Sequence, residues 1–290
     1  MRSRAGVFWY SLGLTLLLLI PLMAVTLFLL YQRQQQQELR QAAAERGGVQ
    51  VEQGSQDCWR MLLVVQQEQP AFVLVRADGP ARTVTLCALP GELQVSAPAG
   101  TTTLADCTLS AGPGRAVQLL QQTLATGETA LPPLYYLAAT PAGWVDFVGS
   151  SSVRFDTASL LGKEVRTALG YGEEPVAEVA ASGAGEFIER LQFGLDTPGE
   201  KAAARAAVWA AFVRQDPELL AAMPEAWRGY SARTLTDLLA QDLAGVEDTL
   251  TWLTGQSALT VDYCVAATVR QGGEVALTEA GSQTLYALLQ

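Results

Sequence analysis

Residues 59–89 read WRMLLVVQQEQPAFVLVRADGPARTVTLCAL, and this stretch decides the fold class. It holds three short runs rich in β-branched and aliphatic residues, Trp59–Val65, Ala71–Ala77 and Arg82–Leu89. Asp78-Gly79-Pro80 separates the last two runs and is a turn signal, so it predicts a hairpin. The runs are almost continuously apolar, which indicates strands that are buried on both faces.

The rest of the chain mixes helical and strand patterns. The residues Thr197-Pro198-Gly199-Glu200 form a capping box with proline at the first helical position, which predicts a helix to about Arg214. Tyr171–Gly185 is rich in small residues and is predicted to be a long loop. The other expected elements are helices over Gly114–Ala125, Pro141–Val148 and Asp156–Gly170, helices opened by Asp216-Pro217 and by Ser231, and strands over Pro132–Ala139 and Leu259–Val269. This mixture predicts an α/β protein, with a sheet between two layers of helices.

An uncharged run of 25 residues, Val7–Tyr31, precedes this domain. At about 1.5 Å per residue it is long enough for a hydrocarbon core of roughly 30 Å, and it is longer than the apolar core of a signal peptide. The short tail before it carries two arginines, which favours a tail inside the cell. We therefore expect a single-pass protein of the cell membrane with a cytoplasmic tail (1–6), a transmembrane helix (7–31), a stalk (32–54) and an extracytoplasmic domain (55–290).

The composition of the 290-residue chain excludes several classes of function. The net charge is −10, and 14 basic against 27 acidic residues follow position 49, so we expect no binding to nucleic acid. The chain contains no histidine, which excludes His-based catalytic triads and zinc sites that need an imidazole. No metal site is expected from these residues.

The four cysteines, Cys58, Cys87, Cys107 and Cys264, show no Cys-x-x-Cys spacing. A thiolate zinc cluster or a thioredoxin-like motif is therefore not expected. Outside the cytoplasm an even number of cysteines permits disulfides, and four cysteines allow three pairings. Cys87 and Cys264 lie in apolar strand-like segments, where buried free thiols are an equally good interpretation. The sequence leaves this choice open.

The order of these elements resembles the LytR-CpsA-Psr family, over roughly residues 55–255. Arg60–Val65 is similar to the first core strand of that family, and Phe72–Glu92 to the hairpin that ends in its Pro-Arg-Asp motif. Leu104–Leu124 and Leu134–Val153 resemble its Asn-Ala-Ala segment and its Tyr-rich strand with the following helix. The resemblance implies a membrane-anchored α/β/α sandwich with a mixed central sheet. In this family the domain transfers polyprenyl-pyrophosphate-linked glycopolymers onto peptidoglycan.

The chain departs from the family where its chemistry resides. The family binds pyrophosphate through several arginines and uses aspartates for Mg²⁺ and proton transfer. Here Pro-Arg-Asp has become Pro90-Gly91-Glu92, the Arg-x-Asp-Thr segment is missing, and the Ser-Asp-rich loop has shrunk to residues 66–70. Lys201 and Arg205 fall near the arginine pair of the family, so we take Lys201, Arg205 and Glu92 as the candidate ligand-binding residues.

Because a pyrophosphate needs several cations around it, these losses favour a non-catalytic relative. We expect a binding or scaffolding module of cell-wall glycopolymer assembly, with no catalytic residue assigned and an apolar groove that holds a lipid chain or a partner. The expected partners are the membrane, through the N-terminal helix, and a polyprenyl-linked lipid or a cell-wall glycan. The alternative is an active phosphotransferase that uses Mg²⁺ and takes its cations from Arg76, Arg154 or Arg190. A third interpretation is a structural envelope protein without a ligand. Three or more cations at the mouth of an apolar tunnel would favour the transferase.

Overall fold

The computed structural model describes residues 57–290, except 99, 126–130, 150, 172–173 and 256–257. The predicted tail (1–6), transmembrane helix (7–31) and stalk (32–54) lie outside the described residues. Within the described part, none of the helices combines the length and the apolar character that a membrane crossing requires.

The predicted strands form the centre of a six-stranded mixed sheet. Strands β1 (Cys58–Val65), β2 (Ala71–Asp78) and β3 (Thr83–Leu89) pair in antiparallel fashion. The hairpin predicted around Asp78-Gly79-Pro80 is confirmed. Beyond β1 the sheet continues with β6 (Tyr135–Ala139), which is parallel to β1, and then with β9 (Thr234–Thr236), which is antiparallel to β6. At the other edge, β10 (Thr260–Tyr263) runs parallel to β3, giving the order β10-β3-β2-β1-β6-β9.

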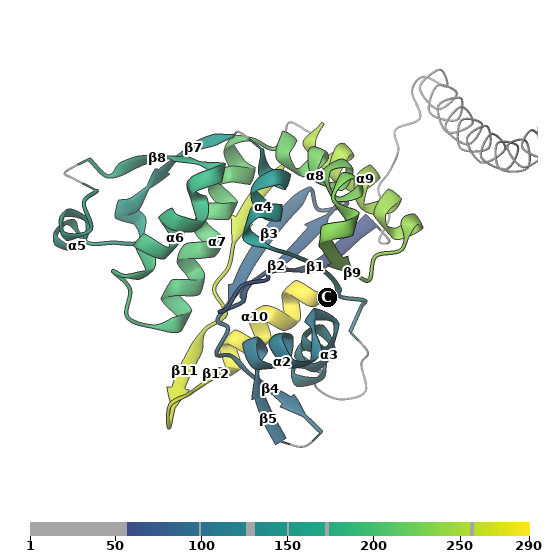
Figure 1. Ribbon diagram of the computed structural model, residues 1–290, viewed down its shortest axis with the longest axis horizontal. Coiled ribbons are helices and arrows are strands. Elements are labelled where there is room, and N and C mark those ends of the chain that lie inside the picture. Colours follow the sequence, from purple (N-terminus) through teal and green to yellow (C-terminus); the bar gives the residue numbers. More distant parts are fainter. Residues whose placement is uncertain (1–56, 99, 126–130, 150, 172–173, 256–257) are drawn as a thin grey trace, which may run out of the picture. The chain divides into compact units, whose positions relative to one another are not determined.

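Helices cover both faces of this sheet, as the continuous apolarity of the strands predicts. Side chains alternate along a strand, so Leu62 and Leu74 face one layer while Met61 and Val75 face the other. The first layer consists of α2 (Leu104–Ala111), α3 (Pro113–Leu124) and α10 (Glu279–Leu289). The second layer consists of α4 (Pro141–Val148), α7 (Pro198–Gln215), α8 (Glu218–Gly229) and α9 (Ala240–Thr254), and Figure 1 shows the two layers on opposite sides of the sheet.

Helix α7 begins as the sequence predicts. The amide of Glu200 donates to the Thr197 hydroxyl oxygen at 3.2 Å, and the Thr197 amide donates to a Glu200 carboxylate oxygen at 2.9 Å. Pro198 occupies the first turn, where its missing N–H costs nothing. The helix is rich in alanine, which lets it pack closely against β3 and β10. Its 18 residues end at Gln215, one residue beyond the predicted Arg214.

The prediction of a long loop over Tyr171–Gly185 is wrong. Residues Val176–Ala180 form β8, which pairs with β7 (Ser152–Asp156) in a separate two-stranded sheet. Only Val179 of β8 is buried, so the strand depends on its partner rather than on its own hydrophobicity, and sequence patterning misses it. Helix α6 (Ala184–Gln192) packs on this small sheet and on α7.

Three further predictions need correction. Asp156 caps a three-residue 3₁₀ turn, and the helix that follows is the short α5 (Lys163–Ala168), because Gly162 separates the two. Ser231 opens another 3₁₀ turn that leads into β9, not a helix. The predicted strand Leu259–Val269 is divided into β10 and β11 (Thr268–Gln271). The sequence analysis did not predict the hairpins β4–β5 (Gln94–Ala97, Gly100–Thr103) and β11–β12 (Glu274–Leu277), nor α10.

Candidate functional site

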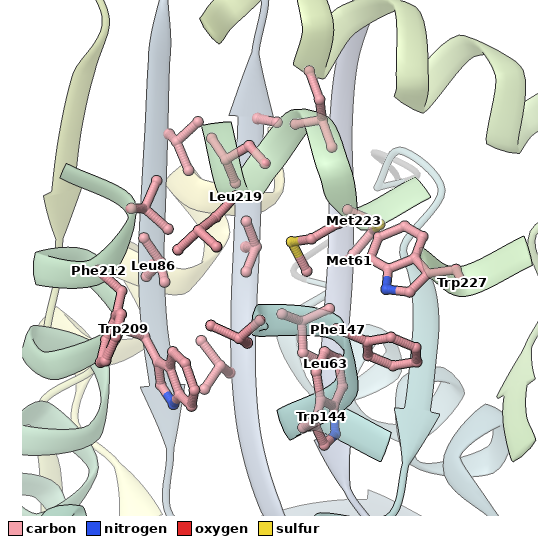
Figure 2. A pocket seen from close by; sticks show the side chains of 18 of the residues that line it. Met61, Leu63, Leu86, Trp144, Phe147, Trp209, Phe212, Leu219, Met223 and Trp227 are labelled. Carbon is pink, nitrogen blue, oxygen red and sulfur yellow. The ribbon is translucent and has the colours of Figure 1, made fainter. Parts of the chain in front are cut away.

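An apolar cavity of about 100 Å³ lies between the sheet and the layer of α4, α7 and α8. Figure 2 shows the labelled side chains that surround it. Every lining residue is aliphatic, aromatic or a methionine: Met61, Leu63, Val65, Val73, Val75, Ala77, Val84, Leu86, Trp144, Phe147, Val148, Trp209, Phe212, Val213, Leu219, Leu220, Met223, Trp227 and Leu250. A chamber with this lining suits a hydrocarbon chain and repels a charged ligand.

Strand alternation explains the floor of the cavity. Every second residue of β1 and β2 points to the same face, so Met61, Leu63 and Val65 stand beside Val73 and Val75. The walls come from helices whose apolar residues recur at four-residue spacing, as Leu219, Met223 and Trp227 do on α8. The helix expected from Asp216-Pro217 onward corresponds to α8, and its apolar stripe at four-residue spacing is the sequence signal for this wall of the cavity.

Helix α4 is fixed against the floor by a buried hydrogen bond. The Trp144 indole nitrogen donates to the Val64 carbonyl oxygen at 3.1 Å. The ring of Trp144 also meets Phe147 edge-on, with 5.4 Å between the ring centroids. The start of α4 is held by Thr140, whose hydroxyl oxygen accepts from the Gly143 amide at 3.3 Å. This wall is therefore preorganised.

Trp227 is one of three tryptophans in the lining, together with Trp144 and Trp209. Its side chain is 4% exposed and lines the cavity from α8 (Figure 2). Its indole nitrogen is buried and finds no hydrogen-bond acceptor among the described residues. A buried N–H without an acceptor is uncommon in folded proteins.

Arg205 brings positive charge close to this cavity. It lies one helical turn before Trp209, which lines the cavity, and is half-buried. Burial lowers the pKa of the Arg205 guanidinium, while the carboxylates of Glu92 and Glu189 act in the opposite direction. The structure thus brings together two of the three residues singled out in the sequence, Arg205 and Glu92.

Glu92 lies in the tight segment that follows β3. The Leu93 amide donates to the Pro90 carbonyl oxygen at 3.2 Å, and the Ala105 amide donates to Gly91 at 2.9 Å, so the turn is held from both sides. The Glu92 side chain is exposed and shares its surroundings with the Arg205 cation. Among the residues that the structure describes, no three carboxylate or thiol groups are arranged to hold a metal ion.

Lys201 lies one turn before Arg205 on α7 and is exposed. Its backbone carbonyl accepts a hydrogen bond of 2.8 Å from the Gln192 side chain, which ties the start of α7 to the end of α6. Lys201, Arg205 and Trp209 follow at four-residue spacing and pass from solvent to the cavity wall. The two turns of α7 that precede the cavity-lining Trp209 therefore each carry a cation.

The three arginines that the transferase alternative would use, Arg76, Arg154 and Arg190, do not surround the cavity with Arg205. The Arg76 guanidinium is 2.6 Å from the Asp78 carboxylate and also donates to the Ala287 carbonyl oxygen at 2.9 Å. Arg190 pairs with Glu186 at 3.2 Å on the exposed side of α6. Arg154 is exposed on β7, outside the six-stranded sheet. None of the described contacts unites these three cations with Arg205.

No family model and no curated protein matches the sequence. Solved structures do match. TagT of Bacillus subtilis aligns with a TM-score of 0.56 and 14% identity, over 84% of this chain and 94% of that chain. The fold is similar to that of TagT. The α/β sandwich with a mixed sheet predicted from the sequence is therefore confirmed.

Two further structures match over most of their length. One is described as a putative transcription regulator from Eubacterium siraeum, with a TM-score of 0.62 and 12% identity over 82% of this chain and 93% of that chain. The other is a transcriptional regulator from Enterococcus faecalis, with a TM-score of 0.56 and 13% identity over 81% and 88%. At these identities the likeness shows the fold alone.

Proposed function

We propose that the chain is a single-pass protein of the cell envelope whose α/β domain binds the lipid part of a polyprenyl-linked cell-wall glycopolymer. The observation that carries the proposal is the cavity, because its lining of aliphatic, aromatic and methionine side chains suits an isoprenoid chain. Each CH₂ buried there would contribute about 0.8 kcal/mol. The fold supports the class of ligand, since TagT has been solved bound to LI-WTA and to LIIa-WTA, which are wall teichoic acid ligands.

In the proposed complex the phosphate end of the lipid lies toward Arg205. The half-buried guanidinium offers charge-assisted hydrogen bonds beside the cavity wall, and Lys201 adds an exposed cation one turn away. The carboxylate of Glu92 reduces the positive charge around Arg205. One half-buried cation opposed by nearby carboxylates suffices to orient a phosphate. A single cation supplies less positive charge than phosphoryl transfer requires, because in that reaction several cations offset the charge that develops in the transition state.

The domain is therefore proposed to be a non-catalytic binding or scaffolding module. The competing function is glycopolymer transfer to peptidoglycan, and the specific observation in its favour is that Arg205 lies one helical turn before Trp209, which lines the cavity. Mg²⁺ would belong only to that alternative. The side chains around Glu92 fit a resident divalent cation poorly, because a guanidinium shares its surroundings.

The two functions are separated by one pair of measurements on the full chain in detergent. Native mass spectrometry with a polyprenyl monophosphate should show a bound lipid. A transfer assay with a polyprenyl-pyrophosphate-linked glycopolymer and peptidoglycan should show no product, with or without Mg²⁺. Transfer that disappears in Arg205→Ala would establish the enzyme instead. Absence of any bound lipid would contradict both functions.

A further inference from the structure

Strand β10 brings two cysteines from distant parts of the sequence to one place. It runs parallel to β3, and the paired residues end with Tyr263 opposite Leu86. The Cys264 amide then donates to the Leu86 carbonyl oxygen at 2.9 Å, which extends the ladder by one residue. In a parallel pair this bond sets Cys264 directly opposite Cys87.

Both cysteine side chains point to the same face of the sheet. Cys87 is completely buried in the core under α2, α3 and α10, and the half-buried Cys264 packs against the same core. The two thiols influence each other's ionisation. The interaction with Cys264, together with burial, raises the pKa of Cys87, and the interaction with Cys87 lowers the pKa of Cys264 against the effect of burial.

Their positions meet the requirements of a disulfide. Neighbouring strands lie about 4.7–4.9 Å apart, and bonded cysteines have Cα atoms roughly 4.4–6.8 Å apart.

The other two cysteines, Cys58 and Cys107, lie in other parts of the fold. The Cys58 thiol is 3.7 Å from an Asp78 carboxylate oxygen at the start of β1, and Cys107 lies in the helical layer on α2.

We propose that Cys87 and Cys264 form a disulfide in the mature protein. The proposal rests on the envelope location given under the proposed function, because disulfides persist in oxidising compartments. The oxidant is a disulfide, either of a small molecule or of a thiol–disulfide oxidoreductase. The Cys264 thiolate attacks one sulfur of the oxidant and releases one thiolate. Cys87 then loses its proton and attacks Cys264, which releases the second thiolate, so two protein thiols are oxidised and one disulfide is reduced.

The bond would join β3 to the chain segment that follows the edge strand β10. Just after Cys264, the Ala267 carbonyl oxygen accepts hydrogen bonds from the Thr278 amide at 3.0 Å and the Thr278 hydroxyl at 3.1 Å, at the start of α10. A Cβ added to Gly199 at the start of α7 would come within 2.9 Å of the Thr268 side chain. The disulfide therefore restrains the segment that connects the core to both α10 and the start of α7.

The test uses the full chain in detergent, oxidised with glutathione disulfide and compared with the reduced chain. Alkylation under denaturing conditions and peptide mapping should show the 87–264 crosslink, with Cys58 and Cys107 alkylated. The unfolding midpoint should rise by roughly 5–15 °C on oxidation. Cys264→Ser should abolish this rise, while the control Cys107→Ser should retain it. A stable glutathione adduct on Cys264, or a different pairing, would overturn the proposal.

A second arm distinguishes this proposal from the proposed function. Cells are quenched with acid and an alkylating agent before lysis, so that thiols and disulfides are trapped as they stand. The crosslinked peptide is expected. Free thiols at both positions in cells would overturn the disulfide of the mature protein even if the pair forms in vitro. Lipid binding is measured separately on the reduced chain, so its loss or retention reports on the proposed function alone.

Discussion

The indole nitrogen of Trp144 donates to the carbonyl oxygen of Val64 at 3.1 Å and thereby joins α4 to β1 beneath the apolar cavity. Trp227 faces the same cavity from α8 with a buried indole nitrogen that no described residue accepts. The two tryptophans are similarly buried, at 9% and 4% exposure, but differ in this one bond. Only the Trp144 indole N–H therefore stabilises the fold through a hydrogen bond.

Replacing each tryptophan with phenylalanine should give different losses of stability. Trp144→Phe removes the bond and leaves the Val64 carbonyl without this donor, so we expect the free energy of unfolding to fall by about 1–3 kcal/mol beyond the packing loss. Trp227→Phe removes an N–H that already lacks a partner and should cost only the packing loss. Urea denaturation of both variants measures the difference. Equal losses would show that the Trp144 bond contributes nothing.

Thr197→Ala should shorten or weaken the start of α7. The hydroxyl accepts from the Glu200 amide at 3.2 Å, and its loss should cost about 0.5–2 kcal/mol of unfolding free energy. Thr197→Ser, which keeps the capping oxygen, is the matched control and should remain close to the wild type. An unchanged unfolding midpoint in Thr197→Ala would mean that the cap does not stabilise the domain.

Asp78 should make the domain sensitive to acid. Burial opposes ionisation of this carboxyl, but the Ala81 amide at 2.8 Å and the Arg76 guanidinium at 2.6 Å prevail and hold its pKa below the ordinary value. A depressed pKa contributes stability above the unfolded pKa of about 3.9, and this contribution is lost as the pH falls through the folded pKa. Asp78→Asn should therefore destabilise the protein at pH 7.

The pH series itself checks the assignment. We expect a loss of about 1–3 kcal/mol in Asp78→Asn near neutral pH, because a charged hydrogen-bonding partner is removed. The wild type and the variant should converge once the pH lies below the folded pKa of Asp78. A difference that stays constant from pH 7 to strongly acidic solution would show that the ionisation of Asp78 is not responsible.

Arg205→Ala should weaken the binding of a polyprenyl phosphate while leaving that of the uncharged polyprenol almost unchanged. A charge-assisted hydrogen bond contributes about 1.5–3 kcal/mol, which corresponds to roughly a 10-fold to 150-fold change in Kd. Arg190→Ala is the control, because Arg190 is exposed and paired with Glu186. Equal weakening for both lipids would indicate that Arg205 supports the cavity wall rather than the phosphate.

Part of this architecture could be predicted from the sequence because its signals are local. The strands around the Asp78-Gly79-Pro80 turn and the capping box of α7 each lie within a few neighbouring residues. Strand β8 could not be predicted in this way, since only Val179 is buried and the pairing with β7 provides its hydrogen bonds. The division of Leu259–Val269 likewise depends on how the chain leaves β3 at Cys264.

The candidate site shows the same division between local and non-local information. The sequence predicted an apolar groove without locating it, because the lining comes from strands and helices far apart in the chain. Glu92 and Arg205 were selected separately through the family resemblance, and only the packing of α7 on β3 brings them together. The pairing of Cys87 with Cys264 also depends on the position of β10 at the edge of the sheet.

Filling the cavity tests the central claim most directly. Met223→Trp places a larger side chain in the cavity wall, whereas Ala222→Trp adds the same side chain at the neighbouring, exposed position of α8. Binding of a polyprenyl monophosphate to the full chain is measured by native mass spectrometry for both variants, after circular dichroism confirms that both are folded. If the lipid occupies this cavity, Met223→Trp should lose at least about tenfold in affinity, which corresponds to about 1.4 kcal/mol, and Ala222→Trp should bind as the wild type does. Wild-type affinity in a folded Met223→Trp would contradict lipid binding in this cavity.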